Sequence, residues 1–134
     1  MSKHETPLTR RYWREVGGTL IEELSIVRAR KGANSGRWID AIILPRATRR
    51  IAKRGDALEI DGQDVIVVQT KAKRLGMAVM GQAIFSIALV KRHYKPKSVK
   101  AVIVCTGHDK ELEALLKPYK KVTVRVYRHK KPAG

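Results

Sequence analysis

The segment DVIVVQTKAK (residues 64–73) places an amide and an ammonium group two residues apart at the end of an apolar run. Side chains alternate along a β-strand, so Gln69 and Lys71 share one face while Thr70 points to the other. The preceding residues on both faces are apolar, which indicates a buried strand. Polar groups at the end of such a strand need partners or a function.

A carboxylate occurs in the preceding strand-like segment, RWIDAIILP (residues 37–45). Asp40 stands there among apolar neighbours, and burying an unpaired carboxylate is costly. Asp40 is therefore predicted either to pair with an Arg or Lys or to act as a ligand. If the two strands are neighbours, Asp40, Gln69 and Lys71 can converge at one place.

Metal-assisted hydrolysis of a phosphodiester is the chemistry that such a group of residues can serve. Hard divalent cations prefer carboxylate and amide oxygens, which Asp40 and Gln69 offer. Such a cation polarises the phosphate and lowers the pKa of an attacking water. Lys71 can orient that water and stabilise the charge that builds on the phosphate. The simpler alternative is that Gln69 and Lys71 are only a strand end that reaches solvent.

Positioning these residues requires a sheet in which the two strands are adjacent. Three consecutive strand-like segments favour an antiparallel meander, and the strand–helix–strand units after them favour parallel additions. Helices then cover both faces of an α/β sandwich. The predicted elements are a helix over 8–16, strands over 19–27 and 37–45, two extended runs around a hairpin turn at Asp61-Gly62 within 57–73, a helix over 77–94, a strand over 98–106, a helix over 109–119 and a strand over 121–127.

The charge of the chain indicates its partner. Lys and Arg number 29 against 12 Asp and Glu, a net charge of +17, which suits nucleic acid because a phosphate backbone rewards a basic surface by counterion release. Aromatic residues make up only 5%, which argues against an anionic membrane and against an extended platform for stacking single strands. With no signal-peptide pattern and a single cysteine, we expect a cytoplasmic protein and no membrane partner.

Basic residues near the polar strand end are candidates for phosphate contacts. Lys73 and Arg74 follow the Gln69–Lys71 pair closely, and Arg49 and Arg50 belong to the basic segment 46–56. The alternative is a solvated run of charges. The length of 134 residues suits a single nuclease-like domain (residues 1–134), with a core over about 8–127 and a basic tail over 128–134.

The element order and the pattern Asp40…Gln69-x-Lys71 resemble the PD-(D/E)xK nuclease superfamily, in particular the D…QxK form of Mrr-like restriction endonucleases. The resemblance implies a restriction-endonuclease-like αβββαβ core, a mixed sheet flanked by helices on both faces. It implies Mg²⁺ or Mn²⁺ held by Asp40, Gln69 and the backbone carbonyl of Thr70, with Lys71 as the catalytic lysine. Gln82, in GQAIFS, resembles a glutamine beside the site of that family.

Two departures from the family pattern matter. Gln69 replaces the usual acid, so the site carries less negative charge and should hold magnesium more weakly, and no proline precedes Asp40. A further carboxylate usually comes from the first helix or the following strand. We favour Glu23, which an antiparallel strand could bring beside Asp40, and then Glu15; the competing residues are Glu5, Glu15, Glu22 and Glu23.

The sequence therefore predicts a metal-dependent endonuclease that hydrolyses phosphodiester bonds in double-stranded DNA. A nuclease fold with a weak or inactive site, retained for nucleic-acid binding, is the alternative, and a small basic structural protein is the third hypothesis. One domain makes one cut per site, so double-strand cleavage would require a homodimer or another partner.

Overall fold

A computed structural model of the chain describes residues 1–33 and 35–128, which contain three α-helices and six β-strands. The predicted basic tail falls, from residue 129 onward, outside the described residues. In chain order the elements are α1 (Glu5–Val16), β1 (Thr19–Val27), β2 (Arg37–Leu44), β3 (Arg50–Ile51), β4 (Asp64–Thr70), α2 (Met77–His93), β5 (Ser98–Cys105), α3 (Lys110–Leu116) and β6 (Val122–Val126).

The strands form one mixed sheet in the order β3-β1-β2-β4-β5-β6. β1, β2 and β4 pair antiparallel in succession. β5 and β6 then add parallel to β4, as their helical crossovers α2 and α3 require. The predicted α/β class, with a meander followed by parallel additions, is confirmed.

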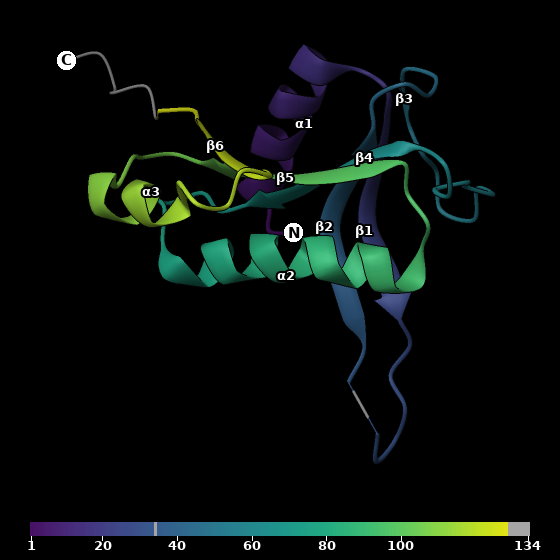
Figure 1. Cartoon of the computed structure of the whole chain (residues 1–134). Helices are drawn as coiled ribbons and strands as arrows, with labels where there is room; N and C mark the ends of the chain where they lie inside the picture. Colours follow the sequence, from purple (N-terminus) through teal and green to yellow (C-terminus); the bar gives the residue numbers. More distant parts are fainter. Residues whose placement is uncertain (34, 129–134) are drawn as a thin grey trace.

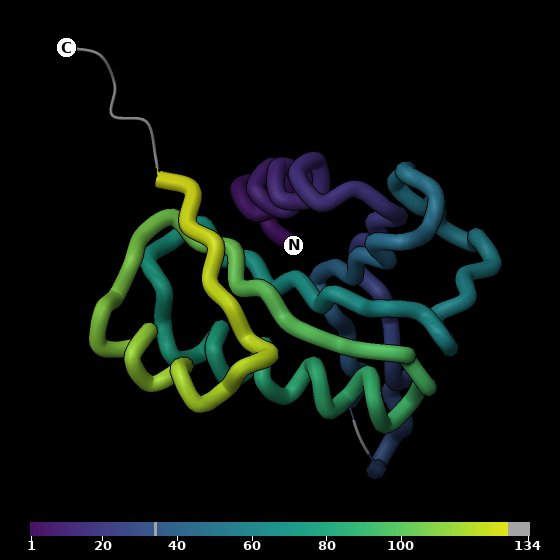
Figure 2. The backbone as a smooth tube through the Cα atoms, turned by 45° about the horizontal axis from the view of Figure 1, so that its top comes forward, coloured from purple at the N-terminus to yellow at the C-terminus, as the bar shows by residue number. Residues whose placement is uncertain are grey.

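The two faces of the sheet are covered by different helices (Figure 1). Leu8, Tyr12, Trp13 and Val16 of α1 pack on one face, against a cluster that includes Ile43 of β2. α2 and α3 cover the other face, and the same two layers are visible in the turned view of Figure 2. The prediction of helices on both faces is confirmed.

The hairpin of β1 and β2 is longer than the rest of the sheet and projects past α2 (Figure 1). Because of this projection, the side chains at the start of β2 lie at the border between the covered and the uncovered part of the sheet. Arg37 and Trp38, the first two residues of β2, are both exposed, whereas Ile39 is buried.

Helix α1 begins at Glu5, three residues before the predicted start at Leu8. Ser2 and Glu5 stabilise this start reciprocally, because the Glu5 N–H donates to Ser2 Oγ over 3.2 Å and the Ser2 N–H donates to Glu5 Oε1 over 2.8 Å. Pro7 lies in the first turn, where its missing N–H costs no helical hydrogen bond. The early start places Glu5 on the helix that covers the sheet.

The hairpin predicted around Asp61-Gly62 is wrong. Residues 57–60 form no strand, although Ile60 is buried against the α2 side of the core. The turn is instead attached to the loop after α2, because Asp61 Oδ1 accepts from the Lys95 N–H over 2.9 Å and the Gly62 N–H donates to the Lys95 carbonyl over 2.8 Å. The two residues of β3, inside the basic segment, pair with β1 instead.

No helix in residues 1–33 and 35–128 has the length and hydrophobicity that a membrane crossing would require.

Gly18, directly after α1, occupies a position that no other residue fits. Its φ is +75°, and a Cβ atom there would lie 2.2 Å from the carbonyl oxygen of Leu44. Gly55 also has a positive φ, +89°, but has open space around it. The first glycine therefore allows β1 to start against the end of β2, and the second only shapes a loop.

We predict that Gly18→Ala destabilises the protein more than Gly55→Ala does. Both substitutions incur the left-handed backbone penalty of about 1–2 kcal/mol, and overpacking against Leu44 adds about 1–3 kcal/mol at Gly18 alone. Urea denaturation measures both free energies of unfolding. Equal losses in the two variants would contradict the close approach at Gly18.

Candidate functional site

Strand β4 carries Gln69, Thr70 and Lys71 to one end of the sheet. Gln69 points to the α2 face, where its Nε2 donates to Ser86 Oγ over 2.9 Å. Thr70 points to the opposite face and its hydroxyl contacts that of Thr9 in α1 over 2.7 Å. The Lys71 N–H donates to the Val104 carbonyl over 2.9 Å, so the ladder with β5 fixes the backbone of Lys71.

Asp40 lies beside Gln69 because of the pairing between β2 and β4. The antiparallel register pairs Ala41 with Val68, so the preceding residue of β2 lines up with the following residue of β4. Asp40 and Gln69 line one hollow of about 420 Å³, with Gln82 and Ser86 of α2 on its other side. We call this the β2–α2 hollow. The structure thus places Asp40 and Gln69 on the same face.

The Asp40 carboxylate has no ion-pair partner among residues 1–33 and 35–128. Burial raises the pKa of this carboxyl above its ordinary value, and the Glu5 carboxylate adds to the rise. The Met1 ammonium, Lys71 and the backbone of Thr70 lower the pKa in opposition. Burial outweighs these opposing effects, so the net pKa of Asp40 is raised.

Gln69 presents its carbonyl oxygen without a donor. The side chain is only 4% exposed, and its Nε2 is used by Ser86. Among the described residues, no hydrogen bond ends on Oε1 of Gln69. The Gln69 side chain lines the β2–α2 hollow together with Asp40. Ser86 therefore fixes the amide plane and leaves an oxygen ligand available.

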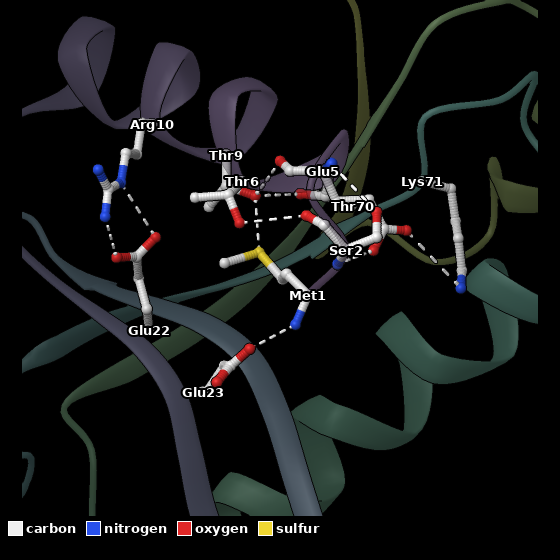
Figure 3. A network of polar contacts seen from close by, with 10 residues as sticks. All are labelled: Met1, Ser2, Glu5, Thr6, Thr9, Arg10, Glu22, Glu23, Thr70 and Lys71. Carbon is white, nitrogen blue, oxygen red and sulfur yellow. Dashed lines mark hydrogen bonds and ion pairs between the residues drawn. The ribbon is translucent and has the colours of Figure 1, made fainter.

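Glu5, rather than Glu23, is the carboxylate that lies beside Lys71. Its Oε2 is 4.0 Å from Lys71 Nζ, and its side chain is 14% exposed, against 60% for Glu23. Burial raises the pKa of Glu5, but hydrogen bonds from Ser2 and the charge of Lys71 outweigh it, so the net pKa is lowered. Figure 3 shows Glu5 pointing toward Lys71 from the start of α1.

Glu23 forms an ion pair of 2.6 Å with the Met1 ammonium (Figure 3). The register of β1 and β2 lines Glu23 up with Asp40, as the sequence predicted from an antiparallel pair. Its φ of +54° makes it, within the described chain, the one non-glycine residue with a positive φ. The other two candidates form bidentate pairs elsewhere, Glu15 with Arg125 and Glu22 with Arg10.

A buried hydroxyl pair fixes α1 over the site. Thr9 is fully buried, and its Oγ1 contacts both Thr70 Oγ1 over 2.7 Å and the Glu5 carbonyl over 3.1 Å. The contact ties the first turns of α1 to the end of β4, one residue before Lys71. No pattern in the sequence indicated this role of Thr9, whereas the Ser2-x-x-Glu5 pattern could have placed Glu5 on the helix.

Lys73 and Arg74 lie next to Lys71 and line a second hollow of about 750 Å³ together with Glu5. We call this the α1–α2 hollow. The loop is fastened to the one after β5, since the Thr106 N–H donates to the Lys73 carbonyl and the Leu75 N–H to the Gly107 carbonyl, over 2.9 and 3.0 Å. This loop presents exposed cations beside Lys71.

Arg49 and Arg50 lie at the opposite end of α1. Arg49 stacks on Trp13 at 5.3 Å and donates to the Arg14 carbonyl, about 14 Å along the helix from Glu5 at 1.5 Å per residue. Arg50 pairs with Asp56 over 2.7 Å. The structure does not bring these two arginines to Asp40 and Lys71, and their contact with phosphates stays a prediction.

The oxygen atoms available for a cation are few. Within residues 1–33 and 35–128, no group of three or more His, Cys, Asp or Glu side chains could hold a metal ion. The set at hand is one carboxylate, Asp40, with the amide oxygen of Gln69 in the same hollow. These are hard ligands, which fit Mg²⁺ or Mn²⁺ in chemistry but carry little negative charge.

The fold is shared with repair endonucleases. A repair endonuclease from Pyrococcus abyssi superposes with a TM-score of 0.54 at 15% identity, covering 96% of this chain and 47% of that chain. EndoMS in complex with double-stranded DNA gives a TM-score of 0.55 at 12% identity, covering 98% and 47%. EndoMS without ligand gives 0.54 at 16% identity, covering 98% and 49%.

At such low identity, these superpositions show a common fold alone. The chain spans about half the length of the proteins that it matches. No family model matches the sequence, and no curated protein matches it. The predicted α/β fold is thereby confirmed, while the D…QxK variant and the likeness to Mrr-like enzymes stay predictions.

We predict that Asp40→Asn stabilises the protein at neutral pH when a chelator is present. Because the folded-state pKa of Asp40 is raised, ionising it disfavours the fold, and this penalty is complete above the folded pKa and absent below the ordinary value of 3.8. The melting temperature of the variant should exceed that of the wild type at pH 7.5, and the gap should narrow as the pH falls toward 4.

Asp64→Asn is the matched control for this prediction. Hydrogen bonds from Ser98 and Arg46 lower the pKa of Asp64, so its charge stabilises the fold above that pKa. The control should therefore melt at a lower temperature than the wild type at pH 7.5. If Asp40→Asn also melts at a lower temperature than the wild type, the prediction is wrong, because neighbouring groups then offset the cost of burying the Asp40 charge.

Proposed function

We propose that this chain is a metal-dependent endonuclease that hydrolyses phosphodiester bonds in DNA. The observation that carries the proposal is the pair of oxygen donors in the β2–α2 hollow. Among the described residues, Asp40 has no ion-pair partner and Gln69 Oε1 accepts no hydrogen bond, and the two line the same hollow. Such donors suit a hard divalent cation, Mg²⁺ or Mn²⁺.

The proposed ligands follow the PD-(D/E)xK pattern in its D…QxK form. They are the Asp40 carboxylate, Gln69 Oε1 and the backbone carbonyl of Thr70. Glu5 is the proposed further carboxylate, because it is less exposed than Glu23 and lies 4.0 Å from Lys71. Glu23, which we favoured from the sequence, remains the second choice because β1 runs beside Asp40.

Each residue has a distinct role in the proposed reaction. A bound cation would polarise the scissile phosphate and lower the pKa of a water molecule. Lys71 orients the attacking water and stabilises the negative charge that develops on the phosphate. Glu5 pairs with the Lys71 ammonium, and Ser86 holds the Gln69 amide by its nitrogen, which leaves the oxygen free to bind a cation.

Double-stranded DNA is the proposed substrate. The net charge is +17, and Lys73 and Arg74 line the α1–α2 hollow beside Lys71, where they can contact phosphates. The solved structures of similar fold are repair endonucleases, one of them in complex with double-stranded DNA, which supports a DNA partner. One chain carries one proposed site, so cutting both strands would require a homodimer or another partner.

A DNA-binding module with weak or absent catalysis is the second candidate. It is favoured by Gln69, a neutral residue at the position where the family has an acid, and by the lack of a larger acidic cluster in the described part of the chain. Fewer negative ligands hold a divalent cation less tightly. The two candidates share the basic surface and differ only in cleavage.

We predict that Lys71→Ala abolishes cleavage and leaves DNA binding nearly unchanged. Plasmid and branched DNA are incubated with Mg²⁺ or Mn²⁺, and binding is measured separately in a chelator. Lys117→Ala, on the exposed end of α3, removes the same charge away from the site and should retain cleavage. Equal cleavage by wild type and Lys71→Ala would refute the assigned role, and binding without cleavage by the wild type would support the module.

We predict that Gln69→Glu tightens Mn²⁺ binding by roughly tenfold or more, because it adds a charged ligand to the site. The Ser86 hydroxyl can donate to the new carboxylate, so the substitution fits locally. Isothermal titration calorimetry measures the affinity. Gln82→Glu places the same charge in the same hollow on α2 and is the control; an equal gain from both variants would argue against a ligand at position 69.

A further inference from the structure

Two exposed aromatic side chains line the β2–α2 hollow. Trp38 of β2 is 63% exposed and Phe85 of α2 is 74% exposed, and both line the hollow that contains Asp40 and Gln69. Exposed rings of this size cost free energy in water, and gathered apolar surface of this kind marks a binding site. Aromatic residues are only 5% of the chain, so two of them in one hollow exceed what the composition would place there by chance.

The geometry of the two elements accounts for the position of both rings. Trp38 and Asp40 are two residues apart on β2 and therefore share the face covered by α2. Phe85 and Leu89 are one turn apart on α2 and face the same hollow. The β1–β2 hairpin projects past α2 (Figure 1), and both rings are mostly exposed to solvent.

Polar side chains line the hollow beside the two rings. Arg37 and Arg92 supply positive charge beside the rings, and Gln82 adds an amide that can donate and accept hydrogen bonds. The volume of about 420 Å³ lies within the usual range for small-ligand pockets. Aromatic walls, cations and a hydrogen-bonding amide together match a nucleobase with its phosphate.

The two hollows beside the proposed site differ in chemistry. Besides Lys71, the α1–α2 hollow contains Lys73 and Arg74, which can contact the phosphates of paired DNA without stacking on its bases. The β2–α2 hollow offers stacking surfaces, which a base inside a duplex cannot reach. The proposed site, with Lys71 in the first hollow and Asp40 in the second, therefore adjoins two surfaces of different chemistry.

We infer that Trp38 and Phe85 bind an unpaired nucleobase that adjoins the duplex, so that the substrate is DNA at a border between paired and unpaired strands. This inference rests on the proposed function and specifies its substrate. The low aromatic content excludes an extended stacking platform, but one base needs only two rings. A second copy of this chain is the competing occupant, and repulsion between two chains of charge +17 disfavours it.

The test measures binding in a chelator, so that it does not depend on cleavage. One probe is a blunt duplex, and the other is a duplex of equal paired length with a short single-stranded extension that contains 2-aminopurine. Fluorescence anisotropy measures the affinity for each probe, and the 2-aminopurine fluorescence reports stacking of the unpaired base. The wild type should prefer the extended probe and quench its fluorescence. Trp38→Ala and Phe85→Ala should each weaken binding of the extended probe roughly tenfold, with blunt-duplex affinity changed less than twofold.

Matched controls separate stacking from general effects. Leu115→Ala in α3 and Tyr119→Ala in the turn after it remove exposed large side chains away from the hollow, and both should leave the two affinities unchanged. Phe85→Tyr keeps the ring and should retain the preference. Because all these side chains are exposed, melting temperatures should stay near that of the wild type.

Three outcomes would overturn the inference: equal binding of the two probes by the wild type, equal losses on both probes in the ring variants, or a dimer in sedimentation that Phe85→Ala dissociates. Failure of the proposed function would give a different result. The wild type would still prefer the extended probe, but Lys71→Ala would cleave DNA no less than the wild type does. If cleavage depends on Lys71 but the wild type binds both probes equally, the inference is overturned and the proposed function stands.

Discussion

The antiparallel pairing of β2 with β4 is the constraint on which the candidate site depends. It aligns Ala41 with Val68 in the middle of the sheet, and both are buried. A shift of one residue would turn Asp40 to the α1 face and separate it from Gln69. The apolar packing of the central strands thus determines the position of two polar side chains at the edge of the core.

Helix α1 completes this arrangement through a polar contact inside an apolar face. The Thr9 hydroxyl meets that of Thr70 at the end of β4, and the capping pair of Ser2 and Glu5 extends the helix beyond it. Glu5 is thereby brought to Lys71 and to the neighbourhood of Asp40. A burial cost on Asp40 is retained in the folded protein, as is common where a charge serves a function instead of stability.

The comparison with repair endonucleases concerns about half of those proteins and only their fold. The proposed chemistry therefore has to come from the residues of this chain. A carboxylate and an amide side chain line one hollow, and Lys71, Lys73 and Arg74 line the α1–α2 hollow. The neutral Gln69 distinguishes this donor set from one with two acids, and it makes metal affinity the quantity that separates an enzyme from a binding module.

Local patterns in the sequence determined most of the strands and helices, the α/β class and the opposite directions of Gln69 and Thr70, because alternation and helical periodicity depend on near neighbours. Tertiary structure alone decided the rest. The run before Asp61 failed as a strand because its turn bonds to Lys95, far along the chain. Glu5 rather than Glu23 lies closest to Lys71, and Trp38 and Phe85 line one hollow, because helix docking brings residues together whose separation in sequence carries no such signal.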